Sequence, residues 1–449
     1  MSLDQRFAEA MGDLLGPDFP PDIGLAVSGG GDSMAMLTLA HNWTHRWGVR
    51  LWVVTIDHGL RPEAVSEAAL VSETCAELGH PHATLRWHWD GQGNVMDAAR
   101  RARLALIDAW RGALRHVLMA HTSDDVAETF LMRLARGSGV EGLSAMVAKR
   151  RIALPEGGVL RACDVSGDLP PVAQREPAFH VVRPCLDMTR DELRHYLRTL
   201  KGRWVEDPTN EDPRYDRARI RRLLGLLEAE GLGADTLAGT AHRMARARDA
   251  LSARARAVWE AIGREVTNPT TGSRNGEIRL DRDGFAGVER DTQLRLLAAV
   301  LQYVSGAEYR PRAAPLEALL DRLLSGGGGT LHGVEARVHG DDLHLFREYD
   351  AVRDLEQPAS DQLWDGRWRM HMAGQDPTGL TIRALGPDGW AQIAEKPAGA
   401  SFAAARSLPA LWRGDALVAC PPLRVGAAGA TLCPMGRVDL TLPGFLDSH

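Results

Sequence analysis

The sequence contains few cysteines, and none of them stands in a pair. The five cysteines of the 449 residues lie far apart, with no Cys-x-x-Cys spacing, at Cys75, Cys163, Cys185, Cys420 and Cys433. This pattern argues against a disulfide framework, a zinc ribbon and a paired-thiol redox site. Long apolar runs are absent as well, and none of the apolar stretches approaches the length that crosses a bilayer.

The N-terminal stretch lacks the features of a secretion signal. Residues 1–15, MSLDQRFAEAMGDLL, contain acids and an amphipathic pattern where a signal would have a basic start and an apolar centre. We therefore expect a cytoplasmic protein with no membrane partner. An excess of basic charge is also missing, since the formal net charge is −6. Net charge averages over domains, so this value excludes no nucleic-acid partner.

The chain does contain enough apolar material for more than one core. Its length predicts two or three domains, and its 44% hydrophobic content is that of a globular protein. In the first 140 residues strand patterns alternate with helical patterns, with strands expected at 23–27, 51–56, 82–87 and 116–120, and helices at 33–43, 66–78, 94–114 and 124–137. The alternation predicts an α/β domain with a Rossmann-like parallel sheet covered on both faces.

The remainder of the chain has a different pattern. Residues 219–324 are helical in pattern and rich in Arg, Ala and Leu, without convincing strands, and SGGGGT at 325–330 predicts a break. A tail dense in Gly, Pro and Trp contains the strand candidates LTIRAL and RVDLTL. We therefore expect three domains: an α/β domain over 1–220, a helical domain over 221–350 and a small β-rich domain over 360–449.

A glycine-rich turn joins the first predicted strand to the first predicted α/β helix, in LAVSGGGDSMAML at 25–37. The amino terminus of a helix offers unpaired N–H groups and partial positive charge to an anion. Glycines let the backbone approach a phosphate closely, and the two serines add hydroxyl donors. The predicted phosphate-binding residues are Ser28, Gly29, Gly30, Gly31 and Ser33.

Asp32 lies within this turn and would repel a phosphate unless a divalent cation lay between them. A Mg²⁺ ligand is therefore its natural role. The alternative is a tight strand–helix connection in which Asp32 or Ser33 caps the helix.

A second motif, HTSDDVAETF, follows the fourth predicted strand. His121, Asp125 and Glu128 are spaced i, i+4 and i+7, so they line one face of a helix and its leading turn. Two carboxylates and an imidazole can hold an ammonium group and then take its proton, which a primary amine must lose before it attacks. The pattern leaves open which of the three is the base. Taken singly, each acid is also explained as a helix cap or a solvated side chain.

Both motifs resemble those of a known enzyme family. SGGGDS is similar to the SGGxDS pyrophosphate loop of N-type ATP pyrophosphatases, which adenylate a substrate and release pyrophosphate. HTSDDVAETF resembles the HxxDDxxET motif of tRNA(Ile)-lysidine synthetases, and RGSGVEGL at 136–143 resembles the RGxGxxGL segment that follows it in that family. Four further segments resemble the family in the family's order: VVTIDHGLRPEA, NVMDAARRARLALI, VVRPCLDMTRDELRHYL and WVEDPTNEDPRYDRARIRRLL.

The resemblance covers residues 23–225 almost continuously, with three departures. Leu104 replaces a usual tyrosine, Cys185 a leucine and Ala218 an asparagine. The Ala218 replacement weakens any role that the family's asparagine would have at this position, but it does not affect the roles expected for Arg217 and Arg221. In the C-terminal part the similarity is looser and rests mainly on LPALWRGDALVACP.

The resemblance implies a ligase reaction on the first anticodon cytidine of an isoleucine tRNA with a CAU anticodon. ATP adenylates O2 of the base, free L-lysine attacks C2 through its ε-amine, and AMP leaves. The modified anticodon then pairs with AUA instead of AUG, and the tRNA changes from methionine to isoleucine identity. The resemblance also implies a homodimer. It assigns ATP-dependent catalysis to the domain over 1–220, tRNA binding to that over 221–350, and recognition of the tRNA acceptor stem to that over 360–449.

The family's residue roles carry over by motif. The glycine turn would hold the pyrophosphate of ATP, Asp32 would bind Mg²⁺, and His121, Asp125 and Glu128 would bind and deprotonate lysine. The further residues expected around ATP are Ile56, His58 and Arg61 near the adenylate, Arg100 with Arg103 on phosphate or on the lysine carboxylate, and Gly137 and Gly139 in a loop over the ribose.

A tRNA needs a broad basic surface, and arginines crowd the end of the first predicted domain. The predicted tRNA contacts are Arg183, Arg203, Arg217 and Arg221, within a wider set that includes Arg190, Arg194, Arg198, Lys201, Arg214, Arg219 and Arg222. Ordinary ion pairs on helices are the alternative explanation of this basic set.

Three other functions are weighed against this one. A tRNA thiolase of the same superfamily would use paired cysteines, which are missing here. An ammonia-dependent amidating synthetase would leave the arginine-rich region unexplained. A nucleotide sensor without chemistry would not need two carboxylates and a histidine for an amine.

Overall fold

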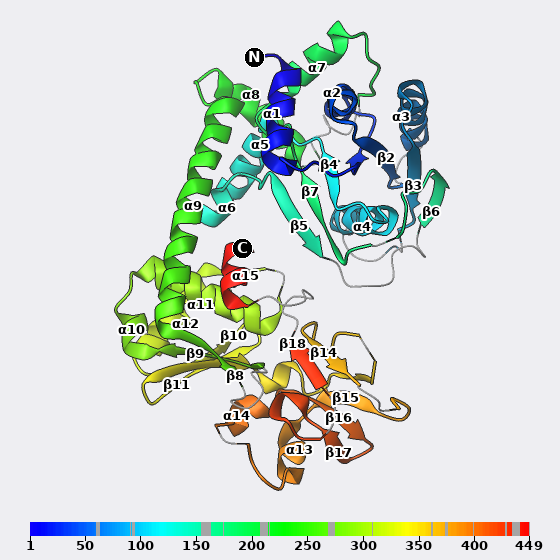
Figure 1. Cartoon of the computed structure of the whole chain (residues 1–449). Coiled ribbons are helices and arrows are strands. Elements are labelled where there is room, and N and C mark those ends of the chain that lie inside the picture. The colour runs from blue at the N-terminus through cyan, green and yellow to red at the C-terminus, as the bar shows by residue number, and fades with distance from the viewer. Residues whose placement is uncertain are drawn as a thin grey trace. The chain divides into compact units, whose positions relative to one another are not determined.

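The computed structural model describes most of the chain as two compact units, Met1–Arg248 and Asp249–His449 (Figure 1). The described residues are 1–59, 63–89, 91, 95–153, 163–173, 175–206, 214, 216–267, 274–307, 309–360, 362–372, 376–397, 399–426, 429–432 and 441–448. Within these ranges, no helix combines the length and the apolar character needed to span a membrane.

The first unit is built on a seven-stranded sheet in the order β5-β7-β4-β1-β2-β3-β6. Its strands are β1 (Asp22–Ala26), β2 (Arg50–Asp57), β3 (His82–Trp87), β4 (His116–Met119), β5 (Lys149–Ala153), β6 (Cys163–Gly167) and β7 (Ala178–Val182). The five central strands are parallel, which confirms the predicted Rossmann-like α/β fold. The two edge strands, β5 and β6, run antiparallel to their neighbours.

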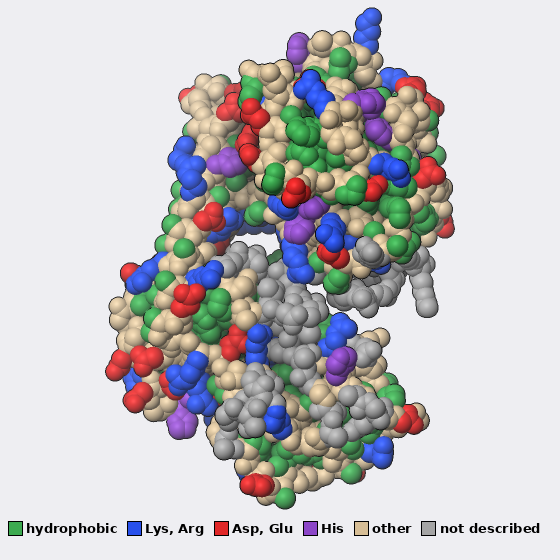
Figure 2. Space-filling view, in the orientation of Figure 1, with side chains coloured by type: hydrophobic (Ala, Val, Ile, Leu, Met, Phe, Trp, Pro, Cys, Tyr) green, Lys and Arg blue, Asp and Glu red, His purple; other side chains and the backbone are tan. Residues whose placement is uncertain are grey.

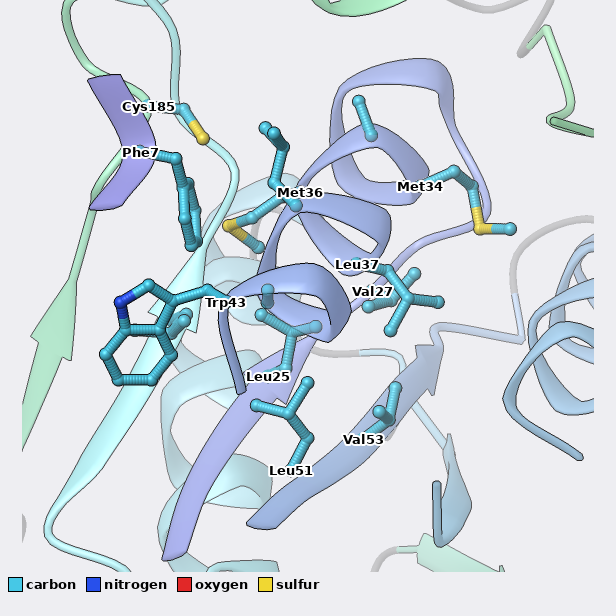
Figure 3. Close-up of a cluster of buried hydrophobic side chains, with 14 of the residues drawn as sticks. Phe7, Leu25, Val27, Met34, Met36, Leu37, Trp43, Leu51, Val53 and Cys185 are labelled. Carbon is cyan, nitrogen blue, oxygen red and sulfur yellow. The ribbon is translucent and has the colours of Figure 1, made fainter. Parts of the chain in front are cut away.

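Helices cover both faces of this sheet, as predicted. They are α1 (Leu3–Leu15), α2 (Gly31–Trp47), α3 (Ala64–Leu78), α4 (Val95–Trp110), α5 (Ser123–Leu134), α6 (Val140–Leu143), α7 (Arg190–Thr199) and α8 (Asp216–Glu228), and the long α9 (Ala234–Ile262) begins in this unit. On one face, Phe7 of α1 and Met36 of α2 pack against Leu25 and Leu51 (Figure 3). On the other face, side chains of α4 such as Leu106 pack against β2 and β3.

The second unit combines helices with antiparallel sheets. A five-stranded sheet in the order β10-β11-β12-β9-β8 packs against helices, and a four-stranded sheet, β13-β15-β16-β17, and a pair, β14-β18, follow. The strands are β8 (Gly263–Thr267), β9 (Arg274–Asp281), β10 (Gly329–Leu331), β11 (Val334–His339), β12 (Asp342–Arg347), β13 (Glu356–Pro358), β14 (Trp368–His371), β15 (Thr381–Ala384), β16 (Pro409–Arg413), β17 (Ala416–Ala419) and β18 (Gly429–Leu432). The helices are α10 (Arg282–Ala286), α11 (Arg290–Ser305), α12 (Ala313–Leu324), α13 (Gly386–Gln392), α14 (Phe402–Ala405) and α15 (Leu442–Ser448).

The expectation of a strand-free stretch over 219–324 is wrong at β8 and β9. The strand β9 places Ile278 and Leu280 in the core, while Arg279 between them is charged. Its partner strand β12 lies about sixty residues later in the chain. The candidate LTIRAL contains β15, whereas the candidate at 437–442 lies mostly outside the described residues and ends where α15 begins. The three-domain division over 1–220, 221–350 and 360–449 stays a prediction.

Candidate functional site

The glycine turn lies between the carboxyl end of β1 and the first turn of α2. Gly30 is the N-cap residue of α2, and in the described structure no side chain caps this helix end. Gly29 has a φ of +84°, in the left-handed region that glycine adopts without strain. The N–H of Val205 donates to the Gly29 carbonyl at 3.0 Å, so a distant segment holds the turn. The first N–H groups of α2 thus have no capping side chain in the described structure, which is the arrangement that an anion-binding helix start requires.

The two serines shape the turn. The Ser33 hydroxyl donates to the Gly30 carbonyl at 2.9 Å and accepts from the Ser28 N–H at 3.1 Å. The two hydroxyl oxygens lie 3.2 Å apart. Ser33 is buried and holds the loop, whereas Ser28 is exposed. The alternative in which Asp32 or Ser33 caps α2 is therefore wrong, because Gly30 occupies that position.

The second motif begins α5 with a reciprocal cap. Thr122 is the N-cap residue, its hydroxyl accepting from the Asp125 N–H, and the Asp125 carboxylate accepts in return from the Thr122 N–H at 3.0 Å. Asp125 therefore has a structural task besides any chemical one. Glu128, one turn further, is fully buried.

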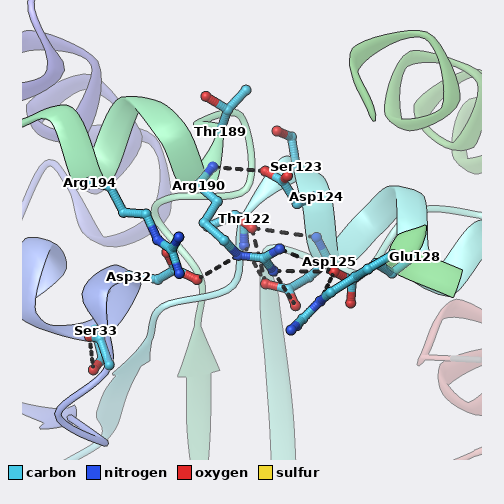
Figure 4. Close-up of polar contacts among 12 residues, drawn as sticks. Asp32, Ser33, Thr122, Ser123, Asp124, Asp125, Glu128, Thr189, Arg190 and Arg194 are labelled. Atoms are coloured by element: carbon cyan, nitrogen blue, oxygen red, sulfur yellow. Dashed lines mark hydrogen bonds and ion pairs between the residues drawn. The ribbon is translucent and has the colours of Figure 1, made fainter. Parts of the chain in front are cut away.

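A single guanidinium joins the acids of both motifs (Figure 4). Arg190, the first residue of α7, places Nε 3.2 Å from Asp32 Oδ2 and Nη1 3.2 Å from Glu128 Oε1. Its Nη2 lies 3.7 Å from Asp125 Oδ1. The structure thus brings Asp32, Asp125 and Glu128 together around one cation. We call these three residues the acid group.

Two further contacts fix this arrangement. The Arg190 backbone N–H donates to Asp124 Oδ2 at 2.7 Å, which ties the start of α7 to α5. Arg221, on α8, donates from Nε to Glu128 Oε1 at 2.6 Å. Glu128 therefore receives two arginines from two different helices.

Burial and these charges shift the pKa values of the site in opposite directions. Burial raises the pKa of Asp32 above its usual value, and Arg190 only partly offsets this. Burial also tends to raise the pKa of Asp125, but the hydrogen bond from Thr122 and the charge of Arg190 hold that pKa below its usual value. Burial and the charge of Arg183 lower the pKa of His121 to about 4, so its imidazole is neutral at pH 7.

Three buried atoms of the site have no hydrogen-bond partner in the part of the chain that the structure describes. They are Asp32 Oδ1, Glu128 Oε2 and His121 Nδ1. Buried polar atoms are rarely left unpaired, so these mark positions where a ligand would donate or accept. Asp32 Oδ1 fits a divalent cation, because Mg²⁺ commonly takes one carboxylate oxygen together with substrate phosphates.

The remaining predicted ATP residues are placed as follows. Ile56 is half-buried near the end of β2, and His58 follows that strand. Burial and the charge of Arg103 lower the pKa of His58 to about 4. Gly137 has a φ of +71°, and Gly139 is the N-cap residue of α6. Arg61 and the side chain of Arg100 lie outside the described residues.

Two of the four predicted tRNA arginines already have acidic partners. Arg203 pairs with Glu73 and Glu77 of α3 at 3.2 and 2.9 Å, and Arg221 pairs with Glu128. Arg183 donates to the Val147 carbonyl, and Arg217 is exposed. The tRNA contacts of these four stay predictions.

Sequence reasoning placed Arg190 in the broad basic set and missed its central position. The available signal was Thr189-Arg190-Asp191-Glu192, in which the N-cap threonine and Glu192 form a capping box that predicts a helix start. That signal places Arg190 at the tip of a helix but does not say what it contacts.

Comparisons with known proteins agree with the motifs. The PP-loop domain family matches residues 3–227. The tRNA(Ile)-lysidine synthase of Ruegeria pomeroyi is 39% identical over 408 residues, which cover 90% of this chain and 88% of the relative. That of Bradyrhizobium sp. is 38% identical over 305 residues, covering 67% and 78%. That of Hyphomonas neptunium is 34% identical over 332 residues, covering 73% and 82%.

Proposed function

This chain belongs to the tRNA(Ile)-lysidine synthase family, and on that premise we propose how its residues divide the reaction. The substrate is an isoleucine tRNA whose CAU anticodon begins with cytidine. O2 of that cytidine attacks the α-phosphorus of ATP, and pyrophosphate leaves. The lysine ε-amine then attacks C2, the C2–O2 bond breaks, and AMP departs with the oxygen.

The observation that carries this proposal is the cation held by the acid group. Asp32, Asp125 and Glu128 already surround one guanidinium, at distances between 3.2 and 3.7 Å. A site with this charge is suited to the ε-ammonium group of free lysine. The unpartnered Glu128 Oε2 offers an acceptor that Arg190 leaves available within the described structure.

We assign the triphosphate to the glycine turn and the first turn of α2. The uncapped N–H groups there would contact the pyrophosphate, and the left-handed Gly29 lets the backbone approach it. Mg²⁺ bound at Asp32 would neutralise phosphate charge during adenylation. ATP is the nucleotide that PP-loop enzymes use, and Asp32 would connect its phosphates to Arg190 and so to Asp125 and Glu128.

Deprotonation of lysine falls to the acid group and His121. The imidazole of His121 is neutral at pH 7, because burial lowers its pKa to about 4, so it can accept a hydrogen bond from an ammonium group. The Asp125 carboxylate already accepts from the N–H and the hydroxyl of Thr122, which suits it to orient the ammonium more than to take its proton. Glu128, with one unpartnered oxygen, is our choice for the base.

The remaining parts of the proposal concern the tRNA contacts, the cellular location and the oligomeric state. Arg183, Arg203, Arg217 and Arg221 are proposed to contact tRNA phosphates, which for Arg203 and Arg221 requires exchange of their present acidic partners. Because tRNA modification takes place where tRNA is used, we propose a cytoplasmic location. A homodimer, implied by the family resemblance, is tested by light scattering of the purified chain.

The deciding experiment is incorporation of radiolabelled lysine into isoleucine tRNA with a CAU anticodon, in the presence of ATP and Mg²⁺. Methionine tRNA with the same anticodon serves as the matched substrate control. We expect ATP-dependent labelling of the first tRNA alone, with AMP released in equal amount. Labelling of neither tRNA, by protein that still binds ATP, would contradict the lysidine reaction.

The sulfur-transfer alternative gains no support from the thiols. Cys75, Cys185 and Cys420 are buried, and among the described residues all four cysteines are free thiols. Burial raises the pKa of Cys75 to about 12, so this thiol is a poor nucleophile at pH 7.

A further inference from the structure

A row of basic and histidine side chains crosses the sheet of the first unit at its amino-terminal end, away from the glycine turn. Arg151 of β5 pairs in register with His180 of β7, and His180 pairs with His116 of β4. Residues paired in register project to the same face of a sheet. The two imidazole rings stack, with centroids 5.4 Å apart and an interplanar angle of 22°.

More positive charge flanks these three residues. Lys149 lies two residues before Arg151 on the same strand, so it shares that face, and its Nζ donates to the Leu14 carbonyl at 2.8 Å. Arg115 directly precedes His116. We call the four residues that share this face the basic row: His116, Lys149, Arg151 and His180. Figure 2 shows Lys, Arg and His side chains, with some acids beside them, on the surface where β5 and β7 lie in Figure 1.

In the part of the chain that the structure describes, few acids balance the charges near the basic row. Arg115 pairs with Glu176 at 2.7 Å, and Glu176 is also the acid whose charge acts on His180. Lys149 and Arg151 are exposed. Burial, with the nearby charges of Lys149 and Arg115, lowers the pKa of His116 to about 4. The two histidines are therefore neutral at pH 7. They offer ring N–H groups as hydrogen-bond donors and add no charge that would repel the neighbouring cations.

Protection of the sheet edge explains only part of this row. Charged side chains on an edge strand discourage pairing with another sheet, which suffices for Lys149 and Arg151. His180 and His116 lie on interior strands, where edge protection requires no polar residue. His116 Nδ1 is buried and has no partner among the described residues. An aligned set of exposed cations and hydrogen-bonding rings matches the phosphate oxygens of a nucleic acid.

We propose that the basic row contacts the phosphate backbone of the tRNA substrate. This inference rests on the proposed function, which supplies the tRNA, and it adds a surface outside the arginines predicted from the motifs. A strand rises about 3.3 Å per residue, so β4 spans roughly 10 Å from His116 to Met119, and His121 follows two residues after its opposite end. One tRNA can therefore touch the row while its target base occupies the site.

The neighbouring residue on β5 provides a matched control. Arg150 is exposed like Arg151, but it pairs in register with Val181 and projects to the opposite face of the sheet. Arg151→Ala and Arg150→Ala therefore remove the same charge from adjacent positions, and Arg151→Lys keeps the charge in the row. All three substitutions are at exposed side chains on one edge strand.

The test is binding of isoleucine tRNA at a series of salt concentrations, without ATP or lysine. For Arg151→Ala we expect Kd to rise about threefold and the slope of log Kd against log salt to fall by about 0.7 to 0.9, the loss of one phosphate contact. Arg150→Ala and Arg151→Lys should match the wild type. Equal Kd values for Arg151→Ala and the wild type, or equal losses of tRNA affinity in the two alanine variants, would contradict the proposed tRNA contact of the basic row.

Lysine incorporation, measured in parallel, separates the two proposals. The KM for tRNA should rise for Arg151→Ala, while kcat and the KM for ATP stay unchanged. If the wild type binds tRNA through the row but incorporates no lysine, the proposed function fails and the row stands. If the wild type incorporates lysine and Arg151→Ala binds tRNA normally, the row fails and the proposed function stands.

Discussion

Arg190 and Glu128 lie 62 residues apart in the chain and meet through two nitrogens of one guanidinium, Nη1 and Nη2, at 3.2 and 3.3 Å from the same carboxylate oxygen. Glu128 is fully buried, so this contact balances a charge that water does not reach. The same guanidinium reaches Asp32 in the glycine turn. One charged side chain at the start of α7 therefore joins the glycine turn to the motif on α5.

Arg190→Ala should lower the stability of the protein markedly. Removal of one partner of a buried ion pair leaves an uncompensated charge and costs about 3 kcal/mol or more. Arg194→Ala, one turn further along α7, is the control, because its partner Glu206 is exposed and such pairs contribute about 1 kcal/mol or less. Urea denaturation followed by circular dichroism gives both values. Equal free energies of unfolding for the two variants would show that Arg190 does not carry this role.

Glu128→Gln should separate the two chemical steps. The amide keeps the shape of the side chain but cannot take a proton, and loss of a general base typically slows a step by about 10² to 10⁴-fold. We expect pyrophosphate release with tRNA and ATP to persist, while lysine-dependent release of AMP falls by at least about 10²-fold.

The control for Glu128→Gln is Glu9→Gln, at an exposed acid of α1 that has no proposed role in the site or in tRNA binding. Both half-reactions should be unaffected in that variant. If Glu128→Gln releases AMP at the wild-type rate, another group takes the proton.

Two adjacent glycines should respond differently to alanine. Gly29 has a positive φ, and a Cβ there would lie 3.3 Å from the Glu67 carbonyl oxygen, so Gly29→Ala should lose about 1–2 kcal/mol of stability. Gly30 has a φ of −73°, and the nearest atom to a Cβ there is 3.6 Å away. Gly30→Ala should therefore fold normally.

ATP binding then tests the phosphate role of the turn. If the backbone approaches the phosphates closely, the added methyl of Gly30→Ala should raise the Kd for ATP about tenfold or more while the melting temperature stays that of the wild type. Isothermal titration calorimetry and thermal unfolding supply the two readings. Unchanged ATP affinity in folded Gly30→Ala would place the triphosphate elsewhere.

Stability should fall as the pH drops from 6.5 toward 4. In the folded protein, burial lowers the pKa of five histidines to about 4: His58, His80, His82, His116 and His121. The unfolded chain binds protons at these positions near pH 6.5, so it gains protons first, and the free energy of unfolding falls through that window. Above pH 6.5 the neutral histidines contribute their full share to the free energy of unfolding.

Substitution of single histidines tests this account. His121→Gln removes one such titration and should make the melting temperature depend less steeply on pH between 6.5 and 4.5. His195→Gln, at an exposed position of α7, should leave the slope unchanged. Equal slopes for His121→Gln and the wild type would show that His121 is not buried in its neutral form.

The parallel sheet and both motifs could be predicted because their signals are local. Strands such as Leu51–Ile56 are short apolar runs, and the glycine turn is contiguous in the chain. Antiparallel edge strands such as β5 could not be predicted, because Lys149 and Arg151 are polar. This strand forms because it pairs with β7, which follows later in the chain. The same holds for β8 and β9, whose charged positions resemble those of a helix surface.

The sequence could predict which acids form the site, but it could predict only some of the contacts between them. Spacing placed Asp125 and Glu128 on one helix face, but the cap between Thr122 and Asp125 depends on backbone geometry at the helix start. Arg190 and Arg221 reach Glu128 from α7 and α8, and no periodicity encodes a contact between separate helices.

The bond from Val205 to the carbonyl of Gly29 has a consequence for how the protein is made. A ribosome releases the glycine turn early, but the segment that holds it follows roughly 175 residues later, and Arg221 later still. A nascent chain that stops before these residues has the motif and lacks its support. The nucleotide site should therefore become competent late in synthesis, after most of the first unit has already emerged.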